Sequence, residues 1–157
     1  MRELLLIRHG KAEAAAFGGD AARALTDDGR AGIASVGAGL AALGLRPDAL
    51  WHSPYRRAVE TAELLGRALG VARAATREEP LLVPGASSER AARALLDASA
   101  RRLACVSHMP LLPELVGRLT GARVDFGTGA VAHLVLAGPH GATLIGLWSA
   151  DLLARVR

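Results

Sequence analysis

The chain has 157 residues, of which 51% are hydrophobic and 22% are charged. This is the length of one ordinary domain, residues 1–157, and the apolar fraction can build a real core, which excludes a disordered tail. The formal net charge of +4 reflects arginine, because Lys11 is the only lysine among the 19 basic residues.

The composition also argues against three other classes of protein. The basic residues are scattered singly or in pairs and aromatic residues make up only 3% of the chain, which disfavours nucleic-acid binding. The longest apolar runs are a few residues, whereas a membrane-spanning helix needs about 20. The lone Cys105 excludes an intramolecular disulfide framework. The apolar stretch near the N-terminus is too short for a signal-peptide core, so we expect a cytoplasmic protein.

The first half of the chain alternates between strands and helices. Residues 3–7 form a short apolar run, which predicts a buried parallel strand that ends at Arg8-His9-Gly10. Residues 11–26 read as a long loop, and Thr26 is a candidate N-cap for a helix that continues to Leu43 and stops at Gly44. Residues 49–52 form a second strand. Ser53 and Pro54 then predict a helix start, with Gly70 as its end.

The second half continues the alternation and ends in a hairpin. The predicted elements are a strand at 71–75, a loop at 77–87, a helix at 88–98 capped by Ser88, a strand at 103–107 and a helix at 110–119. Strands at 130–136 and 143–147 are joined by the turn Gly138-Pro139-His140-Gly141. The pattern predicts an α/β domain with a mostly parallel central sheet and a C-terminal hairpin.

Three predicted segments bring polar residues to one edge of that sheet. The first strand ends in Arg8 and His9, the second leads into Arg56-Arg57, and the fourth ends at His108. Ligands of open α/β sheets bind beyond the carboxyl ends of the strands, so these side chains should converge.

Two histidines with several arginines suit a phosphoryl group. The arginine fork matches phosphate oxygens, a neutral imidazole can attack phosphorus, and a second, protonated imidazole can stabilise the charge. The sequence contains neither a glycine-rich phosphate loop nor an acidic metal cluster, so we expect phosphoryl binding without a metal ion or another cofactor.

Several motifs together resemble a known family. Arg8-His9-Gly10 after the first strand is the signature of the histidine phosphatase superfamily, the phosphoglycerate-mutase-like proteins. Other blocks of the family follow in order, namely Arg23-Ala24-Leu25-Thr26 with Gly29, Ser53-Pro54 with Arg57-Ala58 and Thr61, and Ser107-His108-Met109-Pro110. The small size, Lys11-Ala12-Glu13 and Phe126-Gly127-Thr128-Gly129-Ala130 look most like the SixA-type phosphohistidine phosphatases.

The resemblance implies a three-layer α/β/α fold and a role for each matching residue. His9 would be the nucleophile, Arg8 and Arg57 would bind the phosphoryl oxygens, and His108 would complete the pocket. Arg23 and Met109 would contact the substrate, which would be a phosphorylated protein. Arg56 lies one position away from the family arginine and is interpreted as solvated.

One departure from the family bears on the substrate. The mutases and broad acid phosphatases of the superfamily carry a glutamate after the third strand, which protonates an alcohol leaving group. The corresponding stretch here is Pro80-Leu81-Leu82-Val83-Pro84-Gly85, with Glu78 and Glu79 before it. A phosphorylated imidazole leaves more easily than an alkoxide, so the missing acid favours phosphohistidine.

Structural or surface roles are enough to explain the other candidate residues. We expect a structural or rim role for His52, surface positions for His133 and His140, and a buried apolar role for Cys105. Capping is enough to explain Ser53. The sequence leaves two alternative functions open: a small-molecule phosphomonoesterase of the same fold, acting on a sugar phosphate or ribazole phosphate, and a non-catalytic module that binds phosphoproteins.

Overall fold

The computed structural model describes residues 1–138 and 141–156. In this part of the chain one six-stranded sheet has the order β3-β2-β4-β1-β5-β6. The strands are β1 (Glu3–Arg8), β2 (Ala49–His52), β3 (Thr76–Glu78), β4 (Arg102–Ser107), β5 (Val131–Leu136) and β6 (Ala142–Trp148). β5 is antiparallel to both of its neighbours, whereas β1, β2, β3 and β4 pair in parallel. The predicted mostly parallel sheet is confirmed.

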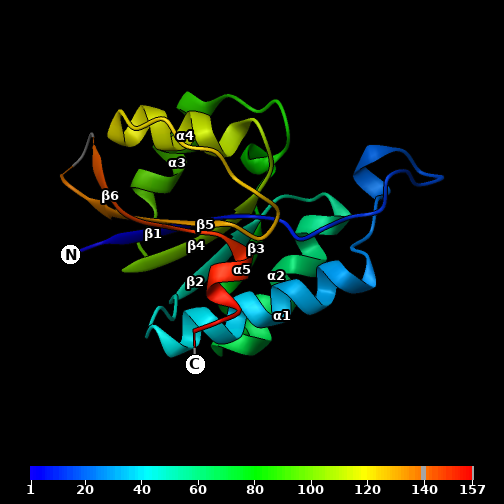
Figure 1. Ribbon diagram of the computed structural model, residues 1–157. Coiled ribbons are helices and arrows are strands. Elements are labelled where there is room, and N and C mark those ends of the chain that lie inside the picture. The colour runs from blue at the N-terminus through cyan, green and yellow to red at the C-terminus, as the bar shows by residue number, and fades with distance from the viewer. Residues whose placement is uncertain (139–140, 157) are drawn as a thin grey trace.

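Helices cover both faces of the sheet, which makes the three predicted layers (Figure 1). Figure 1 shows α1, α2 and α5 on one face and α3 and α4 on the other. The helices are α1 (Asp27–Ala42), α2 (Arg56–Leu69), α3 (Ser88–Asp97), α4 (Leu111–Thr120) and α5 (Ala150–Leu153). Three short 3-10 turns complete the elements: η1 (Asp20–Ala22), η2 (Arg73–Ala75) and η3 (Pro80–Leu82).

The core consists of two apolar clusters, one on each face of the sheet. Along β1, Leu4 and Leu6 belong to the cluster beneath α3 and α4, whereas Leu5 and Ile7 belong to the one beneath α1 and α2. Successive side chains of a strand point to opposite faces, so a strand covered on both faces must be apolar throughout. This explains the continuous apolar run at the start of the sequence and holds Arg8-His9 at its carboxyl end.

Most of the predicted capping residues begin or end a helix as expected. Thr26 accepts a hydrogen bond from the Gly29 amide at 3.0 Å and caps α1. Gly44, Gly70 and Gly121 follow α1, α2 and α4 with positive φ angles of 71°, 72° and 76°. Glycine reaches this left-handed region without strain, which is why it terminates helices.

The third strand was predicted too early. Residues 73–75 form η2, and the strand begins at Thr76, which pairs with Leu50. The Arg-Ala-Ala segment offers no β-branched side chain. In the strand itself, the Arg77 guanidinium lies 3.7 Å from the centroid of the Trp51 ring on the neighbouring strand. This contact with β2 favours the observed register.

Some helix boundaries also differ from the prediction. α2 begins at Arg56, because the Ser53 hydroxyl binds the Tyr55 amide and forms a turn before the helix. α3 is capped by Ser87 rather than Ser88. The four-residue α5, capped by Ser149, is too short to show a helical period and was not predicted.

The C-terminal hairpin pairs as predicted, although its turn is described only in part. β5 and β6 are antiparallel from Val131–Trp148 to Leu136–Ala142. Pro139 and His140 lie outside the described residues. No helix within the described ranges has both the length and the apolar composition needed to cross a membrane.

Candidate active site

The carboxyl ends of β1, β2 and β4 bring three of the predicted site residues together. His9 follows β1, Arg57 lies in the first turn of α2, and His108 follows β4. These three residues are 7%, 4% and 1% exposed, respectively. The centroids of the His9 and His108 rings are 5.0 Å apart, close enough for one phosphoryl group to touch both.

The hydrogen bonds of His9 define its tautomer. Its Nδ1 lies 2.7 Å from the Gly10 carbonyl oxygen, which can only accept, so Nδ1 carries the hydrogen. Its Nε2 accepts a hydrogen bond from Arg57 Nε at 3.1 Å. The Nε2 lone pair therefore points into the site, as a nucleophile at this position would require.

Arg57 is held by several neighbours. Its NH1 and NH2 groups donate to the carbonyl and carboxylate oxygens of Asp20, at 2.7 and 3.1 Å. Thr61 links this turn of α2 to the first strand, because its hydroxyl accepts from the Gly10 amide and donates to the Arg57 carbonyl. The Arg57 guanidinium is therefore carried by α2 but is hydrogen-bonded to the loop after β1.

His108 is held by Ser53 and left open on its other nitrogen. Ser53 Oγ lies 2.7 Å from His108 Nε2 and accepts a hydrogen bond from the Tyr55 amide. The hydroxyl holds this ring nitrogen in either tautomer, because it can donate to a bare Nε2 or accept from an Nε2 hydrogen. His108 Nδ1 is buried without a hydrogen-bond partner among the described residues. In the imidazolium form this nitrogen carries a hydrogen, which fits a phosphoryl oxygen.

Arg8 reaches the same region from the other side. Its NH1 donates to the Phe126 carbonyl at 2.6 Å, while its Nε is buried with no partner in the described chain. The segment around residue 129 supports the end of β1, since the Gly129 amide donates to the carbonyls of Arg8 and His9. Arg8 therefore has an orphaned donor, and its charge helps to lower the pKa of both His9 and His108.

Burial and positive charge keep both imidazoles neutral in the ligand-free protein. Burial lowers the pKa of His9 to about 4, and the charges of Arg57 and Arg8 act in the same direction. Burial also lowers the pKa of His108 to about 3, with His9 and Arg57 adding to the effect. Bound phosphate would oppose these shifts, because an anion favours imidazolium.

The two residues predicted to contact substrate lie further out. Arg23 donates from NH1 to the Asp20 carboxylate at 2.8 Å, so it reaches Arg57 only through that carboxylate. Met109 is half-buried against the core on the α3–α4 face. Their contacts with substrate remain predictions.

The other residues weighed in the sequence have structural explanations. Arg56 is exposed and pairs with Glu60 at 2.9 Å, as expected for a solvated arginine. Cys105 is fully buried in a strand, also as expected. The surface position expected for His133 is wrong: it is 6% exposed and binds Glu3 at 2.8 Å. Its strand, β5, has a neighbour on both sides, which buries its central residues.

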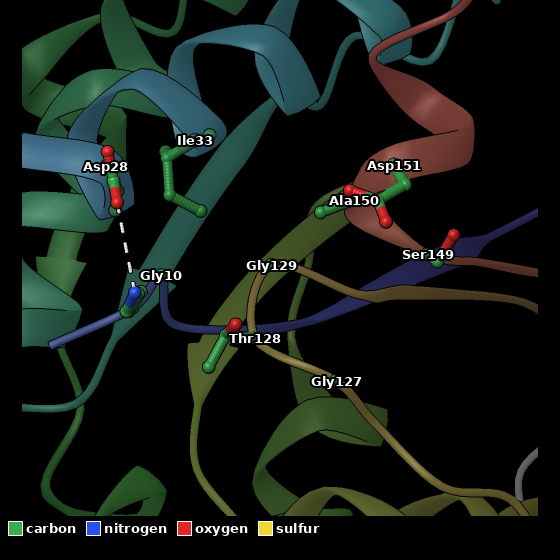
Figure 2. Close-up of a pocket in the computed structure, with 12 residues that line it drawn as sticks. Gly10, Asp28, Ile33, Gly127, Thr128, Gly129, Ser149, Ala150 and Asp151 are labelled. Carbon is green, nitrogen blue, oxygen red and sulfur yellow. Dashed lines mark ion pairs between the residues drawn. The ribbon is translucent and has the colours of Figure 1, made fainter.

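A cavity of about 350 Å³ adjoins the site but does not include the two histidines. Figure 2 shows Gly10 on one side, with Asp28 of α1, the segment 127–129 and the start of α5 around it. The candidate site is therefore defined by the hydrogen bonds around His9 and His108 and not by this cavity. Within the described residues, no three His, Cys, Asp or Glu side chains form a group that could hold a metal ion.

Sequence reasoning missed three contributors to the site. Asp20 binds Arg57, Ser53 orients His108 in addition to its turn contact, and the Tyr55 ring lies 5.2 Å from the His108 ring, centroid to centroid. The acid–base spacing of Asp20 and Arg23, three residues apart in a loop next to the signature, was the available signal for Asp20. Nothing local marks the other two, because their partner follows a different strand.

Comparisons with known proteins agree with this fold. The family model of the histidine phosphatase superfamily (branch 1) matches residues 4–82, which is just over half of the chain. The structure of the protein histidine phosphatase SixA complexed with tungstate has a TM-score of 0.88 and 25% identity, covering 95% of this chain and 97% of that one.

Two further structures show the same fold at lower identity. A protein of Agrobacterium tumefaciens described under the name SixA has a TM-score of 0.81 and 22% identity, over 94% of this chain and 97% of its own. A phosphoserine phosphatase variant of Entamoeba histolytica, in complex with phosphoserine, has a TM-score of 0.75 and 18% identity, over 98% of this chain and 100% of its own. No curated protein sequence matches the chain. The family match and the shared fold together establish that this chain is a phosphatase of the histidine phosphatase superfamily.

Proposed function

We propose that this phosphatase hydrolyses phosphohistidine on a protein, through a phosphoryl group carried transiently by His9. The observation that supports it best is the state of His9. Its Nδ1 hydrogen is held by Gly10, and its Nε2 lone pair lies beside Arg57 and the second histidine. A neutral imidazole held in this way can attack phosphorus without first losing a proton.

In the first step His9 Nε2 forms a bond to phosphorus while the bond from phosphorus to the substrate nitrogen breaks. Arg57 turns its donors from the His9 ring to the phosphoryl oxygens, and Arg8 Nε and Nδ1 of the protonated His108 ring donate to the other oxygens. The departing imidazole takes the bonding electron pair and gains a proton from solvent water. In the second step, a water molecule attacks the phosphorus on His9, and the bond from phosphorus to Nε2 breaks with its electron pair returning to Nε2. The proton of the attacking water passes to solvent, and inorganic phosphate is released.

The surroundings of the glutamates support a nitrogen leaving group over an alcohol. The Glu79 carboxylate accepts from the Leu81 amide at 3.1 Å and pairs with Arg77 at 2.8 Å, so it is engaged in local structure. Glu78 is exposed. An alkoxide needs a positioned acid, whereas imidazole has an ordinary pKa of about 6.5 and gains a proton readily.

The test is a direct comparison of substrates. The purified protein is incubated without added metal with a phosphohistidine-bearing phosphotransfer protein and, in parallel, with phosphoserine, a sugar phosphate and a ribazole phosphate. We expect the phosphohistidine protein to have the highest kcat/KM. A sugar or ribazole phosphate with a higher kcat/KM would favour the small-molecule phosphomonoesterase, and no turnover of any substrate would favour the binding module.

Variants then test the role of the site. His9→Ala removes the atom proposed to bond phosphorus, so turnover should fall by several orders of magnitude and the acid-labile phosphoenzyme should disappear. Arg57→Ala should leave a slow enzyme, because one donor fork at the transition state is worth about 10²–10³ in rate. Arg56→Ala is the matched control, since this exposed neighbour pairs with Glu60 instead. Equal losses in the two arginine variants would contradict the assignment.

A further inference from the structure

All three donor groups of Arg57 already have acceptors in the ligand-free protein. Nε donates to His9 Nε2, NH1 to the Asp20 carbonyl and NH2 to the Asp20 carboxylate. Asp20 belongs to η1, in the loop after the signature, and therefore approaches Arg57 from 37 residues away in sequence. In Figure 1 this loop extends from the carboxyl end of β1, beyond the body of the sheet.

A phosphoryl group at His9 needs the same donors. Its oxygens are anionic and compete directly with the Asp20 carboxylate for the guanidinium fork. The two anions also repel each other if both remain beside Arg57. The Asp20 side chain is 55% exposed, in contrast to 5% for Arg57. The carboxylate can therefore swing into water, where it still has Arg23 as a partner at 2.8 Å.

We infer that Asp20 is a resident anion, which occupies Arg57 until a phosphoryl group displaces it, and which thereby sets the affinity of the site for phosphoryl ligands. Asp20 acts through Arg57, so it sets affinity and is not itself a catalytic residue. The inference rests on the phosphoryl-binding role proposed for Arg57.

A resident anion weakens every phosphoryl ligand by a similar factor, including the product. Inorganic phosphate, which makes no contact outside the phosphoryl pocket, then binds poorly and inhibits little. A phosphohistidine displayed on a protein can recover the difference through contacts made by the rest of that protein with the loop and the rim. Asp20 thus limits inhibition by free phosphate, while a large phosphorylated substrate keeps its affinity through those further contacts.

The experiment measures binding of inorganic phosphate to the whole protein by calorimetry, which needs no turnover. Asp20→Asn keeps the size of the side chain and removes its charge. We expect its Kd for phosphate to fall by about three- to tenfold, because phosphate no longer has to displace the carboxylate. This range corresponds to the free energy of one half-exposed ion pair. On the phosphohistidine protein, KM should fall by a similar factor while kcat stays within about twofold, because the competition affects binding alone.

Three further variants separate the charge from the fold. Asp20→Glu retains a carboxylate and should retain weak phosphate binding. Asp20→Ser is a second neutral variant, in case asparagine disturbs the 3-10 turn. Asp28→Asn removes the same charge from an exposed residue of α1 that pairs with Lys11 at 3.8 Å, and should leave phosphate binding unchanged.

The inference is overturned if both neutral variants bind phosphate as weakly as the natural chain, or more weakly. It is also overturned if Asp20→Glu or Asp28→Asn tightens binding as much as Asp20→Asn does. Arg57→Ala tells this failure apart from failure of the proposed site. If phosphate binding survives that substitution, Arg57 is not the phosphoryl ligand and the proposed function falls with it.

Discussion

His9 and His108 are buried in the neutral form, so they lower the free energy of unfolding at acidic pH. Burial lowers their pKa values from about 6.5 to about 4 and about 3. Between pH 6.5 and these lowered pKa values, the unfolded chain binds more protons than the folded protein. The free energy of unfolding is therefore highest above pH 6.5 and decreases as the pH falls. Each histidine contributes a slope of up to about 1.4 kcal/mol per pH unit.

We therefore expect the free energy of unfolding to decrease between pH 6.5 and 4.5, where the carboxylates of Glu3 and Asp20, whose pKa values are lowered, are still ionised. Urea titrations at several pH values measure this. His108→Gln should flatten the profile over the same interval. A profile that is flat in the natural chain would contradict neutral burial of the two rings.

Ser53 gives a second prediction at this scale. It is fully buried, and its hydroxyl fixes the ring of His108 by binding Nε2. Ser53→Ala should lower kcat by about tenfold or more, because the ring loses the hydrogen bond that orients it. Ser107→Ala is the matched control: it loses a buried hydrogen bond of the same 2.7 Å length, to Leu82, but leaves the ring of His108 held. Equal effects on kcat would reduce Ser53 to a packing residue.

At the scale of elements, the contact between the loop after β1 and the start of α1 positions His9, the proposed nucleophile. A Cβ added to Gly29 would lie 2.0 Å from the Lys11 carbonyl oxygen, and one added to Gly10 would lie 2.7 Å from an Ile33 side-chain carbon. The chain segments can approach this closely only because both residues are glycines. The position of His9 therefore depends on Gly29 as well as on β1.

Gly29→Ala should lower the free energy of unfolding by about 2–4 kcal/mol and reduce kcat/KM, since backbone must move to relieve the contact. Gly32→Ala on the same helix has nothing within 4 Å of the added carbon. It should raise stability by about 0.5–1 kcal/mol, because alanine favours a helix interior over glycine. Thermal unfolding and kinetics measure both. A harmless Gly29→Ala would show that the contact is not needed.

The elements that the sequence predicted well are those whose cause is local. Continuous apolar runs marked β1 and β4, and positive-φ glycines ended α1 and α2 as expected. The register of β3 depends on the contact of Arg77 with Trp51 on another strand, and the burial of His133 depends on the neighbours of β5. Neither feature could be predicted from the residues next to it in sequence. The convergence of His9, Arg57 and His108 followed from the parallel order of the strands. Asp20 was missed, because its partner lies on α2.

At the scale of the whole molecule, the sheet order itself determines which residues can meet. β4 lies between β1 and β2, so the segments that follow these three strands open side by side at one edge. β3, which leads to Glu78 and Glu79, is the outermost strand on the far side of β2. The fold therefore gathers histidines and arginines at the centre and leaves these two carboxylates at the margin.

This placement leads to a final prediction about the leaving group. A general acid contributes about 10²–10⁴ in rate where the leaving group needs a proton. If the substrate is phosphohistidine, Glu78→Gln and Glu79→Gln should each change kcat/KM by less than about twofold. Glu79→Gln should cost a little stability, because the carboxylate binds the Leu81 amide and Arg77, whereas the exposed Glu78 serves as its control. The assay uses the phosphohistidine protein and phosphoserine side by side. A hundredfold loss in either variant on phosphoserine, together with phosphoserine as the better substrate, would assign that glutamate as the acid and make the enzyme a phosphomonoesterase.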